Sequence, residues 1–368
     1  MKVYFEKSVL MNAINTVLKA VPSKTNYKIL ECILIDARQS QVVLTANDTE
    51  LGIETTIDAR IETHGITAIN AKLFAEIIRE LPDSEILLQI EDSTALIQSE
   101  NAKFRIMCDD PDTYILLPQF NKDHSIVISQ FVLKDLIRQT IFSIAVNDSN
   151  PAMAGELFEV KENQLRVCSL DGHRISIRKV ELNDVYPDFQ VVVPGKSLSE
   201  ISKILTGNAD SEVRIFFSRN HISFEFDQTI VVSRLIDKKY FNVDQMLSND
   251  YETCITVNKK ILLESIERST LLVKESDKKP IIFNISQNSM ELIMNSSLGH
   301  MRDEIMIQQY GKDIMIGFNP RFMIEALRVI DDEEVQLYTI NAKAPCFIKD
   351  QNESYIYLIL PVNFNPAI

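Results

Sequence analysis

Three segments of the chain place apolar residues on one side of a helix and charged residues on the other. Apolar positions follow Lys72 and Arg321 at the same intervals of one, two, five, six and nine residues. At about 100° per residue, these positions share one face of an α-helix. A middle segment after Lys196 shows the pattern more weakly, because serine takes two of the five positions. The apolar residues are Leu73, Phe74, Ile77, Ile78 and Leu81 in the first segment, and Phe322, Met323, Ala326, Leu327 and Ile330 in the third.

The charged faces of these helices repeat one pattern: a basic residue, a glutamate four residues later, and a basic residue three residues after that. The copies start at Lys72, Lys196 and Arg321, so they recur about every 124 residues. This interval exceeds the roughly 20–50 residues of a solenoid repeat, and it is long enough for a separate core. We therefore predict three copies of one domain, at residues 1–121, 125–248 and 253–368. The other members of the pattern are Glu76, Arg79, Glu200, Lys203, Glu325 and Arg328.

Each predicted domain also contains an earlier amphipathic helix and several strands. The helices, at 8–21, 129–146 and 258–273, align Leu10 with Leu133 and Leu262. Two strand-like runs joined by a polar turn follow each helix, as in a hairpin: 29–36 with 41–46, 155–160 with 164–169, and 279–286 with 289–294. Another pair closes each domain: 86–91 with 95–98, 212–217 with 221–226, and 334–339 with 346–349. The predicted fold class is α+β, one two-helix, multi-strand unit present three times.

The composition narrows the class of protein. The apolar content of 45% is ordinary for a globular chain, and no apolar run reaches the roughly 18–20 residues of a membrane span. The charged start, with Glu6 and Lys7, does not fit a signal peptide. The 5 cysteines are dispersed without a C-x-x-C pair. We therefore expect reduced thiols, a cytoplasmic location and no membrane partner.

Charge is distributed unevenly along the chain. The net charge of −14 argues by itself against binding to nucleic acid. The six predicted helices nevertheless carry about +5, which leaves about −19 for the remainder. A surface shared by these helices would suit loose, sequence-independent contact with a phosphate backbone. Alternatively, each charged pattern is a solvated helix face with ion pairs inside the helix. Both interpretations remain open at this point.

Five short motifs occur in order along the chain: Thr45-x-x-Asp48-x-Glu50, Gly155-x-Leu157-Phe158-Glu159, Leu170-Asp171-Gly172-His173-Arg174-Ile175, Ile316-Gly317-Phe318-Asn319 and Tyr357-Leu358-Ile359-Leu360-Pro361-Val362. Together with the triplication, they resemble the bacterial DNA sliding clamp, the beta subunit of DNA polymerase III, over essentially the whole chain. This resemblance implies the DNA clamp fold and a head-to-tail homodimer closed into a six-domain ring. Such a ring would encircle double-stranded DNA and act as a polymerase processivity factor.

The resemblance also implies a hydrophobic cleft that binds short linear motifs. The implied partners are the DNA polymerase III alpha subunit, the clamp loader and other proteins that carry a clamp-binding motif. The matching positions are Met153, Leu170, Gly172, His173, Arg174, Ile175, Phe241, Met246, Asn319, Phe322, Leu358, Leu360, Pro361 and Val362. The chain runs four residues past the usual family end, at 365–368, next to this cleft.

Two further sets of residues are predicted, one for the DNA channel and one for the ring interface. Lys24 matches a basic family position, and the other channel candidates come from the helical patterns. The full channel set is Lys24, Lys72, Arg79, Lys134, Arg138, Lys196, Lys203, Lys259, Lys260, Arg268, Arg321 and Arg328. For the ring interface, the resemblance pairs Phe104 and Ile106 with Leu271 and Leu272.

Two other hypotheses compete with a working clamp. An enzyme would centre on Asp171 and His173, but the chain lacks a G-x-S-x-G elbow, a P-loop, a G-x-G-x-x-G motif and paired histidine or cysteine spacings for a metal. We therefore predict no catalytic residue, metal or cofactor. The second hypothesis is a protein of the clamp fold that no longer encircles DNA; ring formation in solution would distinguish it from a working clamp.

Overall fold

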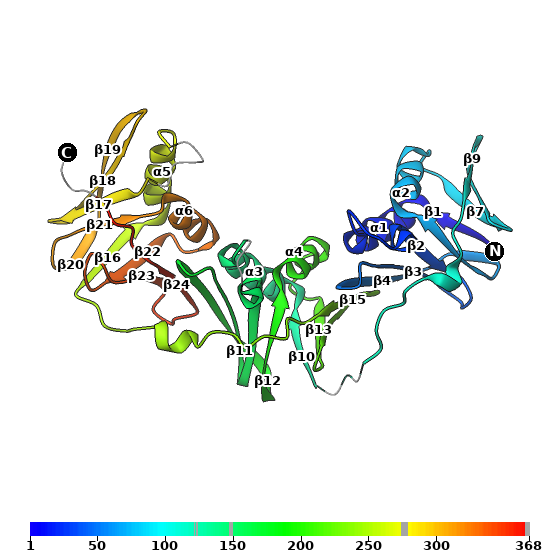
Figure 1. Ribbon diagram of the computed structural model, residues 1–368, viewed down its shortest axis with the longest axis horizontal. Coiled ribbons are helices and arrows are strands. Elements are labelled where there is room, and N and C mark those ends of the chain that lie inside the picture. Colours follow the sequence, from blue (N-terminus) through cyan, green and yellow to red (C-terminus); the bar gives the residue numbers. More distant parts are fainter. Residues whose placement is uncertain (121, 123, 147–149, 274–278, 365–368) are drawn as a thin grey trace. The chain divides into compact units, whose positions relative to one another are not determined.

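The computed structural model describes residues 1–120, 122, 124–146, 150–273 and 279–364 (Figure 1). The chain separates into two compact units. One consists of Met1–Lys134 with Lys196–Leu235, and the other of Asp135–Gly195 with Ile236–Ile368. The middle third of the chain therefore contributes to both units.

Two antiparallel sheets build the first unit. Their strands are β1 (Lys2–Glu6), β2 (Cys32–Asp36), β3 (Val42–Asn47), β4 (Leu51–Ile57), β5 (Arg60–Thr63), β6 (Ile66–Asn70), β7 (Glu85–Glu91), β8 (Thr94–Ser99), β9 (Ala102–Met107), β10 (His124–Ser129), β13 (Glu212–Phe217), β14 (His221–Phe226) and β15 (Thr229–Arg234). The orders are β5-β1-β7-β8-β9 and β10-β13-β14-β15-β4-β3-β2-β6. Because β15 pairs with β4, strands from the first and middle thirds form one continuous sheet.

The second unit repeats this arrangement. Its strands are β11 (Gly155–Leu170), β12 (Arg174–Pro194), β16 (Thr253–Asn258), β17 (Ile281–Ser286), β18 (Ser289–Ser296), β19 (Gly299–Met306), β20 (Gln308–Gly311), β21 (Ile314–Phe318), β22 (Glu334–Thr339), β23 (Cys346–Lys349) and β24 (Tyr355–Ile359). The orders are β11-β12-β24-β23-β22-β16-β20 and β19-β18-β17-β21. Here the pairing of β12 with β24 joins the middle third to the last.

All six predicted helices are present. They are α1 (Lys7–Val17), α2 (Ala71–Glu80), α3 (Gln130–Thr140), α4 (Gly195–Ile204), α5 (Lys259–Thr270) and α6 (Pro320–Val329). Asn70, Asn258 and Asn319 cap α2, α5 and α6, because each side chain accepts a hydrogen bond from a backbone N–H of the first turn. The apolar backs of α2 and α6 are buried, except at their first position. Leu73 is 43% exposed, because it lies at the edge of the apolar stripe in the first helical turn.

Most predicted hairpins are confirmed. Ser286 pairs with Ser289, and both turn residues between them, Gln287 and Asn288, have positive φ, as a two-residue turn requires. The three closing pairs are β7 with β8, β13 with β14, and β22 with β23.

Three predicted elements differ from the structure. Residues Lys28–Glu31 form a 3₁₀ turn, so the strand predicted from 29 begins at Cys32. The helix predicted to 146 ends at Thr140, whose hydroxyl donates to the carbonyl of Leu136. The break predicted between 160 and 164 lies inside β11, where the pairing with β12 shifts register around Glu162. Glu162 has a φ of 52°, so the polar turn signal marks a local irregularity within this strand.

The remaining expectations concern thiols and membranes. All five cysteines are free, as predicted, and four are buried. In the described part of the chain, no helix is long and apolar enough to cross a membrane.

Candidate functional site

An apolar layer collects where β12 and β24 meet. Ile175 lies opposite Leu358, and both are at most 5% exposed. They belong to one cluster with Leu170, and Met153 and Phe241 pack against it from partly buried positions. Five predicted cleft residues therefore share one apolar layer. The buried members provide its floor, and the partly buried ones border it.

Other predicted cleft residues are held at the surface of this region. Met246 is 43% exposed and Leu360 is 36% exposed. The backbone N–H of Leu360 donates to the carbonyl of His173 at 2.9 Å, so the carboxyl-terminal segment is bonded to the turn before β12. Gly172 gives this turn a φ of +83°, a conformation that side-chain-bearing residues rarely adopt.

The predicted segment at Pro361 and Val362 is also fixed by the backbone. The N–H of Val362 donates to the carbonyl of Gly317 at 2.8 Å. Asn319 accepts from the N–H of Arg321 at 3.0 Å, so its side-chain oxygen is already used by the cap of α6. Residues 365–368, predicted to lie next to the cleft, fall outside the described residues.

Arg174 is nearly buried beside the apolar layer, with 8% of its surface exposed, and it contacts several elements around it. Its Nε donates to Asp171 at 2.9 Å, and its two terminal nitrogens contact the Glu325 carboxylate and the Phe142 carbonyl. The guanidinium carbon lies 4.3 Å from the centroid of the Phe322 ring, a cation–π contact. Arg174 therefore joins the turn before β12 to α6.

The aromatic rings next to Arg174 complete this arrangement. The His173 ring stacks on Phe322 with centroids 6.3 Å apart. Cys168 is the thiol inside the apolar layer, and burial raises its pKa to about 12. Because a thiolate is the reactive form, this cysteine is an inert core residue.

Two lysines predicted for the DNA channel donate hydrogen bonds to carbonyl oxygens at helix ends. Lys134 donates to the carbonyl of Leu205 at 2.8 Å, and Lys259 donates to the carbonyl of Ile330 at 2.6 Å. Each carbonyl lies at the end of the second helix of its repeat, where backbone oxygens lack helical partners. Lys7, which the sequence analysis did not single out, contacts the carbonyl of Leu81 in the same way. The aligned helix starts of Lys7 and Lys259 could have revealed this shared role.

Ion pairs engage a further set of predicted channel residues. Among them, Lys196 contacts Asp48 at 2.8 Å, and Arg328 contacts Glu267 at 2.7 Å. Arg138, Lys203, Lys260, Arg268 and Arg321 also have carboxylate partners. The charge on these helix faces is therefore largely compensated locally, and only some of these pairs lie inside a single helix.

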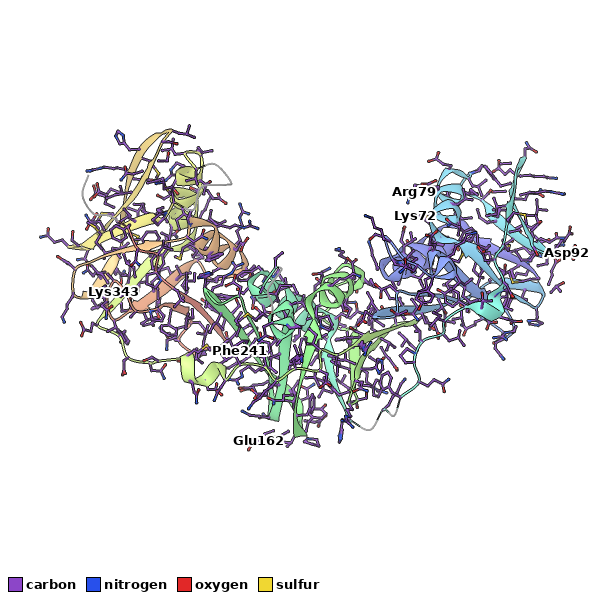
Figure 2. The ribbon with its side chains drawn as sticks, in the orientation of Figure 1. Lys72, Arg79, Asp92, Glu162, Phe241 and Lys343 are labelled. Atoms are coloured by element: carbon purple, nitrogen blue, oxygen red, sulfur yellow. The ribbon has the colours of Figure 1, made fainter. Side chains whose placement is uncertain are left out.

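Three predicted channel residues have neither an ion pair nor a side-chain hydrogen bond within the described chain. Lys24, Lys72 and Arg79 are exposed and form no ion pair with any described residue. Lys72 and Arg79 both project from α2 (Figure 2). They are the strongest candidates for contact with an external anion.

Two of the predicted interface residues lie on an edge strand, and the other two follow a helix. Phe104 and Ile106 are on β9, an edge strand, and Phe104 is 39% exposed. Leu271 follows α5 and is 80% exposed, whereas Leu272 packs partly against the core of its own unit. Exposed apolar residues at unpaired edges are typical of surfaces that pair with another chain.

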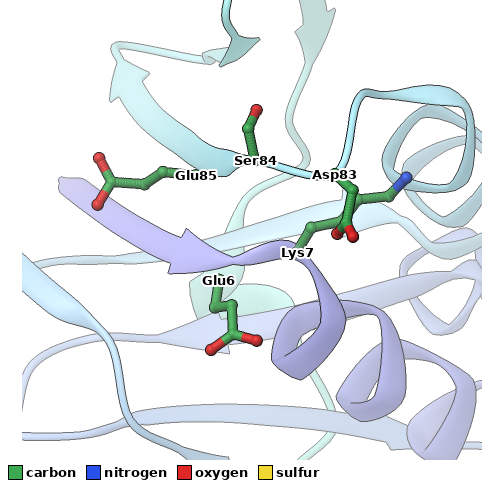
Figure 3. Close-up of a pocket in the computed structure, with 5 residues that line it drawn as sticks. All are labelled: Glu6, Lys7, Asp83, Ser84 and Glu85. Carbon is green, nitrogen blue, oxygen red and sulfur yellow. The ribbon is translucent and has the colours of Figure 1, made fainter.

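One cavity lies away from the apolar layer described above, and a second borders it. One, of about 410 Å³, is lined by Glu6, Lys7, Asp83, Ser84 and Glu85 (Figure 3). Three carboxylates make it unsuited to phosphate or to an apolar anchor. The other, of about 110 Å³, shares Phe347 and Ile356 with the apolar cluster. Among the described residues, no group of histidine, cysteine and carboxylate side chains could hold a metal ion.

Comparisons with known proteins cover nearly the whole chain. Family models of the DNA polymerase III beta subunit match in order: the N-terminal domain at 1–118, the central domain at 127–242 and the C-terminal domain at 244–363. The beta sliding clamp of Staphylococcus epidermidis is 31% identical over 374 residues, which cover 98% of this chain and 99% of that protein.

Solved structures agree with this match. A DNA polymerase III beta subunit from Eubacterium rectale is 57% identical, with a TM-score of 0.96 over 99% of this chain and 100% of that chain. The DNA polymerase sliding clamp of Bacillus subtilis is 32% identical, with the same TM-score and the same coverage.

Proposed function

The chain belongs to the DNA polymerase III beta subunit family, the sliding clamps, and on this premise we propose that it is the processivity factor of a replicative DNA polymerase. The observation that carries this proposal is the ordered match of three clamp domain models along one chain. The family is non-catalytic, in agreement with the absence of enzyme motifs from the sequence. Its activity is topological and mechanical.

The proposed assembly is a head-to-tail homodimer of three-domain protomers around duplex DNA, with domains at 1–121, 125–248 and 253–368. A head-to-tail contact that closes gives a finite ring. A closed ring cannot leave circular DNA sideways, so a tethered polymerase stays at high effective concentration near its template. Edge strand β9 with Phe104 and Ile106, and the segment at Leu271 and Leu272, support this mode of assembly.

The channel proposal assigns weak, sequence-independent phosphate contact to the helices. Lys24, Lys72 and Arg79 would make the main contacts, because their side chains are exposed and have neither a carboxylate nor a carbonyl partner in the described chain. Residues such as Lys196 and Arg328 would exchange their carboxylate partners for phosphate only transiently. Such local compensation limits the affinity and permits sliding.

The peptide proposal places partner motifs on the apolar layer of β12 and β24. Met246 and Leu360 are accessible to a peptide, and Leu170, Ile175 and Leu358 form the floor. An apolar pocket with a few polar groups is the usual site for a peptide anchor. The DNA polymerase III alpha subunit, the clamp loader and other motif-bearing proteins are the proposed partners, in the cytoplasm.

Retention on DNA tests the topological function. The protein is loaded by its clamp loader onto a nicked circular plasmid and passed over a gel-filtration column, before and after linearisation of the plasmid. We expect co-elution with the circle and loss from the linear form. Equal retention on both forms would indicate ordinary electrostatic binding. No retention on either would favour a protein of the clamp fold that does not encircle DNA.

A binding experiment tests the peptide site separately. A labelled peptide with a glutamine and two apolar anchors should bind saturably to the full-length protein. Leu360→Asp should abolish that binding, because it places a charge on the apolar layer. Val185→Asp changes an equally apolar residue that is 77% exposed on β12 and is the matched control. Equal saturable binding by Leu360→Asp and Val185→Asp would show that the peptide does not bind at Leu360.

A further inference from the structure

The central glutamate of the third helical pattern differs from those of the other two copies. Glu76 is exposed on α2, and Glu200 contacts Lys203 within α4 at 2.7 Å. The side chains of Glu325 and Glu200 are 22% and 21% exposed, so these two glutamates differ in their partners and not in their burial. One oxygen of Glu325 contacts Arg321 on the same helix at 2.8 Å, and the other contacts Arg174. Glu325 is thus shared between two arginines.

The two arginines have very different surroundings. The Arg321 side chain is 80% exposed, on the charged face of α6. Arg174 is 8% exposed and lies against the ring of Phe322, in the predicted peptide site. Glu325 therefore connects a solvent-facing cation to a buried cation 151 positions away along the chain.

The position of Arg174 depends on a small set of partners. Its guanidinium has two carboxylate neighbours, Asp171 and Glu325, besides the Phe142 carbonyl. A nearly buried guanidinium is costly unless its charge is compensated. Removal of the Glu325 charge should loosen Arg174, and with it the Phe322 and His173 rings that rest beside it.

We propose that Glu325 is a positioning residue of the peptide site and couples that site to phosphate contact at Arg321. This inference rests on the proposed peptide and channel functions. A phosphate near Arg321 competes with Glu325 for the exposed guanidinium, and the Glu325 carboxylate then interacts with Arg174 alone. Arg174 is held more firmly, so motif peptides bind more tightly in the presence of duplex DNA. Linkage requires the reciprocal effect of peptide on DNA affinity.

The positioning role is tested by fluorescence anisotropy with the labelled motif peptide and the full-length protein. Glu325→Gln keeps the shape of the side chain and removes its charge, and we expect it to raise the peptide Kd about tenfold. Glu200→Gln is the matched control, because it occupies the same pattern position and its ion-pair partner among the described residues is Lys203 of the same helix. Equal Kd values for these two variants would overturn the positioning role.

The coupling is tested by repeating the titration at low ionic strength with an excess of a short linear duplex that can thread the ring. We expect the wild-type Kd to fall about threefold, and the fall to disappear in Glu325→Gln and Arg321→Gln. Asp171→Asn removes the other carboxylate of Arg174 without touching Arg321. It should raise the Kd and keep the response to duplex, which separates coupling from general loosening.

The outcomes distinguish the inference from its premise. If the wild-type protein binds no motif peptide, the proposed peptide site fails, and this inference fails with it. If the peptide binds and duplex leaves its Kd unchanged, only the coupling fails. A response to duplex that persists in Glu325→Gln would place the coupling elsewhere.

Discussion

At the scale of single residues, burial changes the chemistry of Glu156 most. This β11 residue is 0% exposed, and neither carboxylate oxygen has a hydrogen-bond partner in the described part of the chain. Burial raises the pKa of Glu156 well above its ordinary value of 4.5. The folded protein therefore holds this side chain in its neutral form, since an unpaired buried charge is strongly unfavourable.

The raised pKa of Glu156 makes stability depend on pH. Below about pH 4.5 the group is protonated in both folded and unfolded chains, so its burial adds no pH-dependent cost. Above that pH the unfolded chain ionises first, and stability falls by about 1.4 kcal/mol per pH unit until the folded pKa is reached. We expect Glu156→Gln to lack this decline, so the free energy of unfolding of the variant should rise relative to that of the wild type as the pH increases above about 5.

Urea unfolding at several pH values measures this difference. Glu162→Gln changes an exposed glutamate of the same strand and should follow the wild-type profile (Figure 2). Parallel profiles for the wild type and Glu156→Gln would contradict a neutral Glu156 in the folded state.

At the scale of elements, a lysine from the first helix of each repeat bonds the end of the second helix. Lys7, Lys134 and Lys259 reach the carbonyls of Leu81, Leu205 and Ile330, respectively. A cation at a helix carboxyl end satisfies a free carbonyl and complements the helix dipole. These contacts fix how the two helices of a repeat lie against each other.

A variant of Lys259 tests this helix-end contact. Lys259→Met keeps most of the side-chain volume and removes the donor, and we expect a loss of about 1–2 kcal/mol of stability. Lys260→Met changes the next residue, whose side chain is 82% exposed and 3.9 Å from Glu264, and should have little effect. Urea unfolding midpoints compare the two. Equal midpoints for the two variants would show that the hydrogen bond of Lys259 does not stabilise the protein.

At the scale of the whole molecule, unpaired sheet edges carry exposed apolar side chains. Met107 on β9 is 72% exposed, and Met306 on the edge strand β19 is 77% exposed. Leu271 is 80% exposed. Burial of such side chains between protomers would stabilise a dimer by about 1.5–3 kcal/mol each.

Leu271→Asp tests the assembly. A charge in place of a buried leucine, present at both interfaces of a closed dimer, should weaken dimerisation at least about tenfold. Analytical ultracentrifugation over a concentration series should show Leu271→Asp dissociating at a protein concentration at least about tenfold higher than the wild type, whereas Val185→Asp should follow the wild type. If Leu271→Asp leaves the dimer unaffected, Leu271 is not part of the dimer interface.

The sequence alone determined the repeats, the six helices and most of the strands, because apolar periodicity and turn residues act locally. It did not determine the first strand boundary near Cys32 or the local irregularity at Glu162. Both depend on which residue of another strand lies opposite: Cys32 pairs with Asn70 of β6, and Glu162 pairs with Tyr186 of β12. The sequence also showed that the common enzyme motifs are absent. Its five ordered motifs indicated the sliding clamp family.

Only the tertiary structure decided what each charged residue does. Lys72 and Lys259 look alike in the sequence, yet one is exposed on α2 and the other bonds the end of α6. Glu200 and Glu325 occupy one pattern position, yet of the two only Glu325, on α6, contacts an arginine of a distant strand, Arg174 of β12. The physical reason is that a long side chain reaches partners set by the packing of distant elements, and a local pattern holds no information about those partners.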